Sequence, residues 1–168
     1  SFNNNINSDN FYDIKISEYF DLINYLSRYI EPKKITITFD DGFKSIIPAV
    51  EEAKKKGFQT IVFIITDYIN SEGFLTKKDI SYLNEIGCIV GSHSKSHNNL
   101  SNIPDDLLKI ELLESKKYLE KLIGKKVNHF SYPYGSFNKN LINKVNKIYK
   151  YNAISRPNYF KKKNIIGR

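Results

Sequence analysis

Apolar residues follow two alternating patterns along the chain, short continuous runs and longer stretches with helical spacing. The short runs are rich in β-branched residues, which is typical of strands buried on both faces. The longer stretches repeat apolar residues every three or four positions, which predicts amphipathic helices. The expected strands are residues 34–39, 58–65, 88–91, 127–132 and 152–155. The expected helices are residues 17–30, 43–56, 76–85, 105–123 and 138–149.

Capping residues bound several of these helices. Ser17 and Thr76 have short side chains that can accept a hydrogen bond from the first helical turn, so we expect them to be N-caps. Pro32 cannot continue a helix, and Gly57 and Gly124 stand where helices are expected to end.

After the first expected helix, strands and helices alternate strictly. This alternation begins with the strand at 34–39 and ends with the strand at 152–155. Such alternation predicts a parallel sheet with right-handed crossovers. Either a barrel or an open, doubly wound sheet satisfies it. At 168 residues, we expect one domain over residues 1–168, with the Asn-rich residues 1–10 as a flexible arm.

Composition adds little to this fold class. The net charge of +8 suggests nucleic acid as a partner, but the lysine runs at 54–56 and 161–163 are short and no nucleic-acid motif accompanies them. No apolar run reaches the ~20 residues of a membrane span. Cys88 is the single cysteine, so no internal disulfide is expected. Ser1 is not a natural start, so a targeting segment could precede it.

Polar features with chemical potential come directly after expected strands. Asp40 and Asp41 follow the first strand, His93 and His97 follow the third, and a Pro-Tyr-Gly segment at 133–135 follows the fourth. In a parallel sheet the carboxyl ends of the strands lie at one edge, where α/β proteins place their sites. We therefore expect these three loops to converge. Taken alone, Asp-Asp-Gly is equally well a polar turn.

The histidine pair is the most informative feature. His93 and His97 have the spacing at which two imidazoles can reach one metal ion, and the chain contains only three histidines. Asp41 would complete a set of two histidines and one carboxylate. That set suits zinc in hydrolysis or iron in oxygen chemistry. The alternative is that both are ordinary surface histidines in a polar loop.

Residues 38–42 (TFDDG), 93–97 (HSKSH) and 130–135 (FSYPYG) resemble the first three motifs of NodB-type polysaccharide deacetylases, carbohydrate esterase family 4. The resemblance covers residues 34–156 in the right order. It implies a distorted (β/α) barrel of parallel strands, incomplete at the C-terminus, and the removal of acetyl groups from N- or O-acetylated sugars.

The same resemblance assigns roles by position. It implies that Asp41, His93 and His97 are metal ligands, with Zn²⁺ preferred and Co²⁺ or Ni²⁺ as alternatives. Asp40 corresponds to the catalytic base. The backbone N–H of Tyr134 would stabilise the oxyanion, in a substrate-binding turn shaped by Pro133 and Gly135.

Two departures from the family pattern stand out. Many members carry an arginine where this chain has Ser131. The family also ends in a histidine that acts as general acid, yet no histidine follows His129, which begins its strand and so lies at the wrong end. Either this protein lacks the acid, or the sequence is a fragment, in which case we expect the natural chain to continue beyond Arg168 with at least one more strand and a histidine near the metal.

These observations favour a metal-dependent hydrolase that deacetylates an N-acetylated glycan, either a GlcNAc-type polysaccharide or peptidoglycan, outside the cytoplasm. The expected partner is the glycan, with no nucleic acid; the oligomeric state stays open. One alternative is a non-catalytic carbohydrate-binding relative that retains the metal site. A non-haem iron oxygenase shares the ligand set, but it gives no reason for Asp40 or for the Pro-Tyr-Gly loop.

Overall fold

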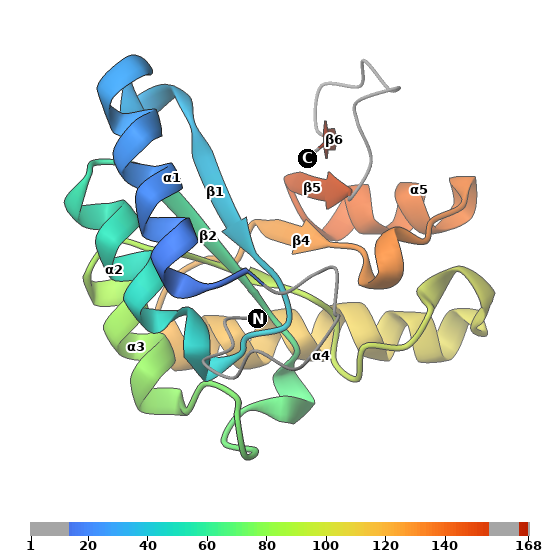
Figure 1. Cartoon of the computed structure of the whole chain (residues 1–168). Helices are drawn as coiled ribbons and strands as arrows, with labels where there is room; N and C mark the ends of the chain where they lie inside the picture. Colours follow the sequence, from blue (N-terminus) through green and yellow to red (C-terminus); the bar gives the residue numbers. More distant parts are fainter. Residues whose placement is uncertain (1–13, 155–164, 168) are drawn as a thin grey trace.

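The computed structural model describes residues 14–154 and 165–167, and the expected N-terminal arm lies outside them. The described strands form one parallel sheet in the order of the sequence, from β1 to β6 (Figure 1). The strands are β1 (Thr36–Phe39), β2 (Gln59–Ile64), β3 (Ile89–Ser92), β4 (His129–Ser131), β5 (Tyr151–Ile154) and β6 (Ile165–Gly167).

The strand order decides between the two predicted architectures. A doubly wound sheet reverses its strand order at a switch point, whereas a barrel adds each strand beside the previous one. Here every neighbouring pair is parallel and consecutive in sequence. The sheet is therefore a curled part of a (β/α) barrel, as the sequence resemblance implied. β6 was not predicted, because a three-residue strand carries too little pattern to be detected without its partner β5.

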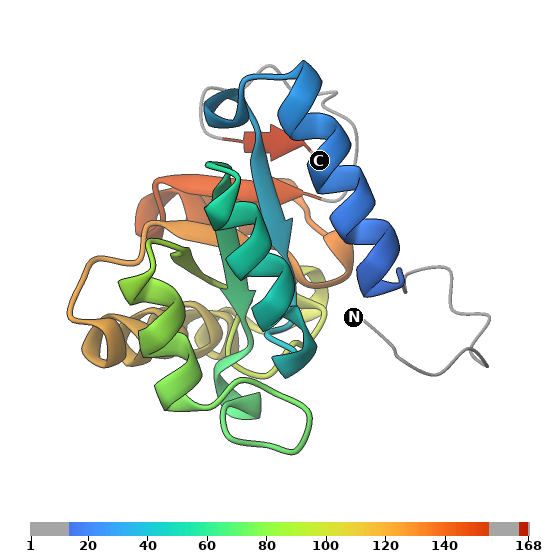
Figure 2. The same cartoon turned by 60° about the vertical axis from the view of Figure 1, so that its left-hand side comes forward.

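Five α-helices accompany the sheet in the part of the chain that the structure describes. They are α1 (Ile16–Tyr29), α2 (Ile47–Lys55), α3 (Lys77–Glu85), α4 (Asp105–Ile123) and α5 (Lys139–Ile148). The first three stand side by side next to β1 and β2 (Figures 1 and 2). No helix in the described part of the chain is long and apolar enough to cross a membrane.

The helix ends test the predicted caps. Thr76 is the N-cap of α3, where its Oγ1 accepts the Asp79 N–H at 3.2 Å. Gly124 ends α4 in the left-handed conformation, with φ 66°. The Ser17 prediction was wrong, because Lys15 is the N-cap of α1 and Ser17 lies inside the helix. The carboxylate of Glu18 accepts the Lys15 N–H at 3.4 Å. An acidic side chain in the first turn therefore satisfies a free N–H at the start of the helix, the role expected of a serine.

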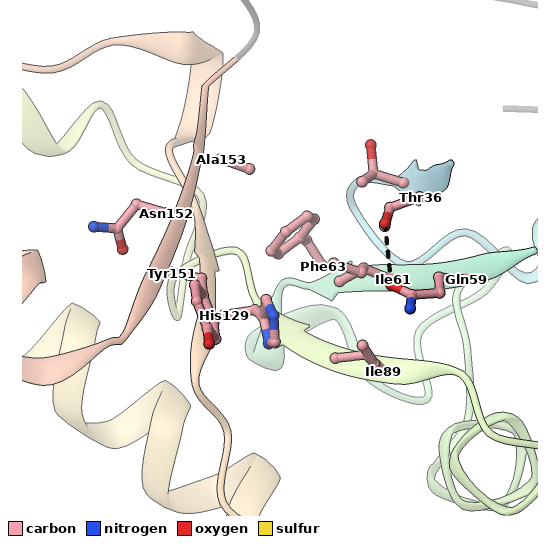
Figure 3. Close-up of a pocket in the computed structure, with 10 residues that line it drawn as sticks. Thr36, Gln59, Ile61, Phe63, Ile89, His129, Tyr151, Asn152 and Ala153 are labelled. Carbon is pink, nitrogen blue, oxygen red and sulfur yellow. Dashed lines mark hydrogen bonds between the residues drawn. The ribbon is translucent and has the colours of Figure 1, made fainter. Parts of the chain in front are cut away.

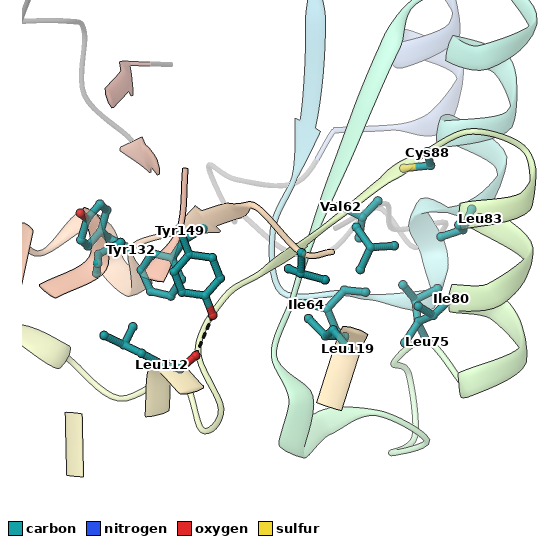
Figure 4. Packing of buried hydrophobic residues seen from close by; sticks show 14 of the residues in the cluster. Val62, Ile64, Leu75, Ile80, Leu83, Cys88, Leu112, Leu119, Tyr132 and Tyr149 are labelled. Carbon is teal, nitrogen blue, oxygen red and sulfur yellow. Dashed lines mark hydrogen bonds between the residues drawn. The ribbon is translucent and has the colours of Figure 1, made fainter. Parts of the chain in front are cut away.

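The main core lies between the sheet and the helices (Figure 4). Val62 and Ile64 of β2 point into it, and α4 contributes Leu112 and Leu119. The Tyr149 hydroxyl donates to the Leu112 carbonyl at 2.8 Å, which satisfies its polar end inside the core. Full burial of a valine, leucine or isoleucine side chain in this core stabilises the fold by about 1.5–3 kcal/mol relative to exposure.

The opposite, concave face of the sheet holds a separate cavity of about 380 Å³ (Figure 3). Phe63 lies on this face over Gly91, and Thr36 donates to the side chain of Gln59 at its rim. His129 stacks on Tyr151 here, with ring centroids 4.8 Å apart, and burial lowers the pKa of His129. Thr36, Gln59, His129 and Tyr151 all begin their strands. The cavity therefore lies toward the amino ends of the strands, away from the loops with candidate chemistry.

Candidate active site

Asp40 and Asp41 form a tight turn directly after β1. The Gly42 N–H donates to the Asp40 carbonyl at 2.8 Å, and Asp41 and Gly42 both have left-handed backbones, with φ 68° and 82°. Aspartate tolerates this conformation better than most side chains, and glycine adopts it freely. The turn places both aspartates at the carboxyl end of β1, where they line one cleft.

The two histidines lie on the loop that follows β3. The His93 side chain is buried, and its Nδ1 lies 2.8 Å from the carbonyl oxygen of Ser131 in β4. With Nδ1–H donating to that carbonyl, Nε2 presents its lone pair to the site. His97 is partly buried, with φ 63°, and its N–H donates to Ser94 Oγ at 3.0 Å.

Asp41, His93 and His97 are brought together as a potential metal-ligand set. Asp41 Oδ1 lies 3.4 Å from Nε2 of His93 and 3.4 Å from Nε2 of His97. All three ligand atoms lie within 4.8 Å of one another. Two ligands of a tetrahedral ion at about 2.1 Å are separated by about 3.4 Å, so the donor set fits a zinc-like ion.

The charges of the cluster also suit a cation. Burial favours protonation of Asp41, but the neighbouring imidazoles of His93 and His97 hold the pKa of Asp41 below its ordinary value. Burial and the neighbouring His93 lower the pKa of His97, although Asp41 and Asp40 act in the opposite direction. A deprotonated carboxylate and a neutral imidazole are the forms that bind metal.

The predicted third loop completes the site. Pro133–Gly135 forms one 3₁₀ turn in which Tyr134 has φ 59°, and the Tyr134 ring lies 4.6 Å from that of His97. A cleft of about 420 Å³ opens beside these groups. Its lining comprises Asp40, Asp41, His93, His97, Tyr132, Tyr134 and Gly135. Of the predicted site residues, only Pro133 is absent from the lining; it is buried in the same turn.

Sequence reasoning missed two residues at the site: Tyr132, which lines the cleft, and Glu111, which contacts the loop of His97. Glu111 of α4 is 7% exposed, and its carboxylate accepts hydrogen bonds from the loop that carries His97. Ile110, an apolar residue that was expected on the buried face of this helix, is 41% exposed instead. The spacing of residues could have revealed Glu111. It is three residues after Leu108 and four before Ser115, so it lies on the same buried face of α4 as these two residues.

The fold and the site together define a class of protein: a barrel-type α/β protein with two imidazoles and two carboxylates at the carboxyl ends of its strands. A family model described as polysaccharide deacetylase matches residues 28–153. The chain belongs to the polysaccharide deacetylase family.

Individual relatives agree with this assignment. A chitooligosaccharide deacetylase from Azorhizobium caulinodans is 32% identical over 117 residues, which are 68% of this chain and 54% of the relative. The chain spans about half the length of the curated relatives it matches.

Solved structures share the fold. BC0361, a polysaccharide deacetylase from Bacillus cereus, superposes with a TM-score of 0.79 at 22% identity, covering 93% of this chain and 57% of that one. IcaB from Ammonifex degensii superposes with a TM-score of 0.80 at 20% identity, covering 96% of this chain and 85% of that one. The expected distorted (β/α) barrel is thus confirmed.

Proposed function

We propose that this chain is the catalytic domain of a metal-dependent hydrolase that removes acetyl groups from an N-acetylated glycan. Family membership supports the reaction class. The observation that carries the proposal is the 3.4 Å approach of Asp41 Oδ1 to both imidazoles, in a cleft that Asp40 also lines.

Asp41, His93 and His97 would hold the metal, for which Zn²⁺ suits the two-nitrogen, one-oxygen set and Co²⁺ or Ni²⁺ are alternatives. A divalent ion bound there would polarise the acetyl carbonyl and make a water molecule more acidic. The Ser131 carbonyl fixes the ring of His93 through the main chain. Any residue at position 131 can make that contact, so the absence of the family arginine leaves the orientation of His93 intact.

Asp40 and Tyr134 would carry the remaining steps, which end when the proton taken up by Asp40 passes to the amine nitrogen as the C–N bond breaks. Asp40 accepts the proton of the attacking water, because a second carboxylate beside the ligand set is placed to act as a general base. The Tyr134 N–H donates to the oxyanion as the acetyl carbon becomes tetrahedral. The left-handed φ of Tyr134 turns this peptide relative to its neighbours, and Pro133 and Gly135 shape the turn.

The substrate that fits best is a polymer of N-acetylglucosamine type or peptidoglycan. The Tyr134 ring is 71% exposed beside the cleft, which suits stacking against a sugar ring. The name of the Azorhizobium relative points to N-acetylated oligosaccharides. Because such polymers belong to the cell envelope or its surroundings, we place the activity outside the cytoplasm.

The two aspartates provide the test. In the natural protein loaded with zinc, Asp40→Asn should keep its metal and lose about 10²–10⁴-fold in acetate release, since an amide cannot accept the water's proton. Asp41→Asn should lose the metal itself. Metal content by mass spectrometry and acetate release from an acetylated chitooligosaccharide measure the two effects separately.

Equal metal loss in both variants would show that the roles are wrongly divided. A non-catalytic relative would give a different result: wild-type protein would bind zinc and glycan without releasing acetate, and Asp40→Asn would change nothing.

A further inference from the structure

The buried carboxylate of Glu111 contacts the metal-site loop through several hydrogen bonds. Its Oε2 accepts the backbone N–H groups of Lys95 and Ser96, each at 2.9 Å, and its Oε1 accepts the Ser96 hydroxyl. Glu111 belongs to α4, fourteen residues beyond His97 in the sequence. All three donors lie in the two residues that separate Ser94 from His97.

The same helix also holds the other side of this loop. Ser115, one turn after Glu111, accepts a hydrogen bond from the hydroxyl of Ser92 at 2.9 Å. Ser92 directly precedes His93 at the end of β3. α4 therefore contacts the chain on both sides of His93, through the Ser92 side chain before it and through the loop after it, where Glu111 makes the contact toward His97.

This loop needs external support because its backbone is strained. Ser94 and His97 both adopt left-handed φ, 67° and 63°, which side-chain-bearing residues rarely do. A buried carboxylate is itself costly unless hydrogen bonds compensate for its lost hydration. Here the donors come from the loop, so the charge of Glu111 and the conformation of the loop stabilise each other.

We propose that Glu111 is a positioning residue for the metal centre, holding residues 94–97 so that Nε2 of His97 faces Asp41. The inference rests on the proposed function, since it presumes that His97 binds metal. It predicts that the affinity for metal, measured on folded protein, depends on a side chain that touches neither the metal nor the substrate.

Three variants separate positioning from a general effect on stability. Glu111→Ala leaves the Lys95 and Ser96 N–H groups without their acceptor. Glu111→Gln keeps the shape, because its amide oxygen can accept both N–H groups and its NH₂ can donate to the Ser96 hydroxyl. Glu120→Ala is the matched control: Glu120 is on the same helix and accepts the Val127 N–H at 3.0 Å, from a loop that carries no site residue.

The measurement is titration of Zn²⁺ into metal-free protein by calorimetry, at a temperature where circular dichroism shows each variant folded. Loss of an outer-shell partner typically weakens metal binding 10–100-fold, and we expect Glu111→Ala to lose about 10-fold or more. Glu111→Gln should stay close to wild type, and Glu120→Ala should lower the melting temperature without changing zinc affinity.

Wild-type affinity in Glu111→Ala, or an equal loss in Glu120→Ala, would overturn the inference. If Glu111→Ala does not fold, Ser96→Ala removes one of the three hydrogen bonds and should weaken zinc binding about two- to tenfold. Wild-type zinc affinity in Ser96→Ala would also overturn the inference. Wild-type protein that binds no zinc would instead refute the proposed function.

Discussion

Replacing Gly91 of β3 with alanine tests how tightly the concave face of the sheet is packed. A Cβ at this position would lie 2.6 and 2.7 Å from two ring carbons of Phe63 and 3.2 Å from the His129 carbonyl oxygen. A Cβ atom essentially never lies within 3.0 Å of a heavy atom from a distant residue, so the Phe63 ring must move. Phe63 is 1% exposed, so its ring can move only toward the cavity of about 380 Å³ that it lines.

Two opposing effects set the size of the change. Alanine restricts the unfolded chain and so stabilises a strand by about 0.4–1 kcal/mol where its backbone conformation is allowed. Overpacking a rigid core costs about 1–3 kcal/mol. Because two ring atoms and a carbonyl confine the new methyl group, we expect overpacking to dominate, with a net loss of about 2 kcal/mol. For a domain of this size that lowers the melting temperature by about 4–8 °C.

Urea denaturation of four proteins provides the assay: wild type, Gly91→Ala, Phe63→Leu and the double variant. Phe63→Leu alone should cost about 1 kcal/mol through the space it leaves. The double variant should be more stable than the sum of the single losses by about 1 kcal/mol, because the smaller side chain makes room for the methyl group. Strict additivity, or wild-type stability in Gly91→Ala, would refute the packing explanation.

Two further predictions concern stability. Thr76→Ala removes the N-cap of α3, so it should cost about 1 kcal/mol, measured as a fall in the urea midpoint; Thr76→Ser, which keeps the hydroxyl, is its control. Burial lowers the pKa of His129 below its ordinary 6.5, so the unfolded chain binds a proton more readily and stability falls as the pH drops through that value. His129→Phe keeps a ring against Tyr151 without titrating, so the stability of metal-free protein should fall less between pH 7.5 and 5, with the contribution of His97 remaining; an unchanged pH dependence would contradict this.

The sequence determined the elements and the residues of the site. Helical and strand periodicities are local properties, so α4 was predicted at its observed bounds, 105–123, and β1–β5 within a few residues of theirs. The convergence of Asp41, His93 and His97 also followed from the sequence, because the carboxyl ends of parallel strands lie at one edge. The motif resemblance then supplied their proposed roles.

Tertiary structure alone decided between a barrel and a doubly wound sheet, since both have the same alternation of strand and helix. It also added β6, whose pairing with β5 defines it. The supports of the proposed metal site were hidden for a different reason. The Ser131 carbonyl that orients His93 and the N–H groups that bind Glu111 belong to the backbone, which every residue carries. Any residue type can make a backbone contact between distant segments, so the sequence does not reveal such a contact and only the folded structure does.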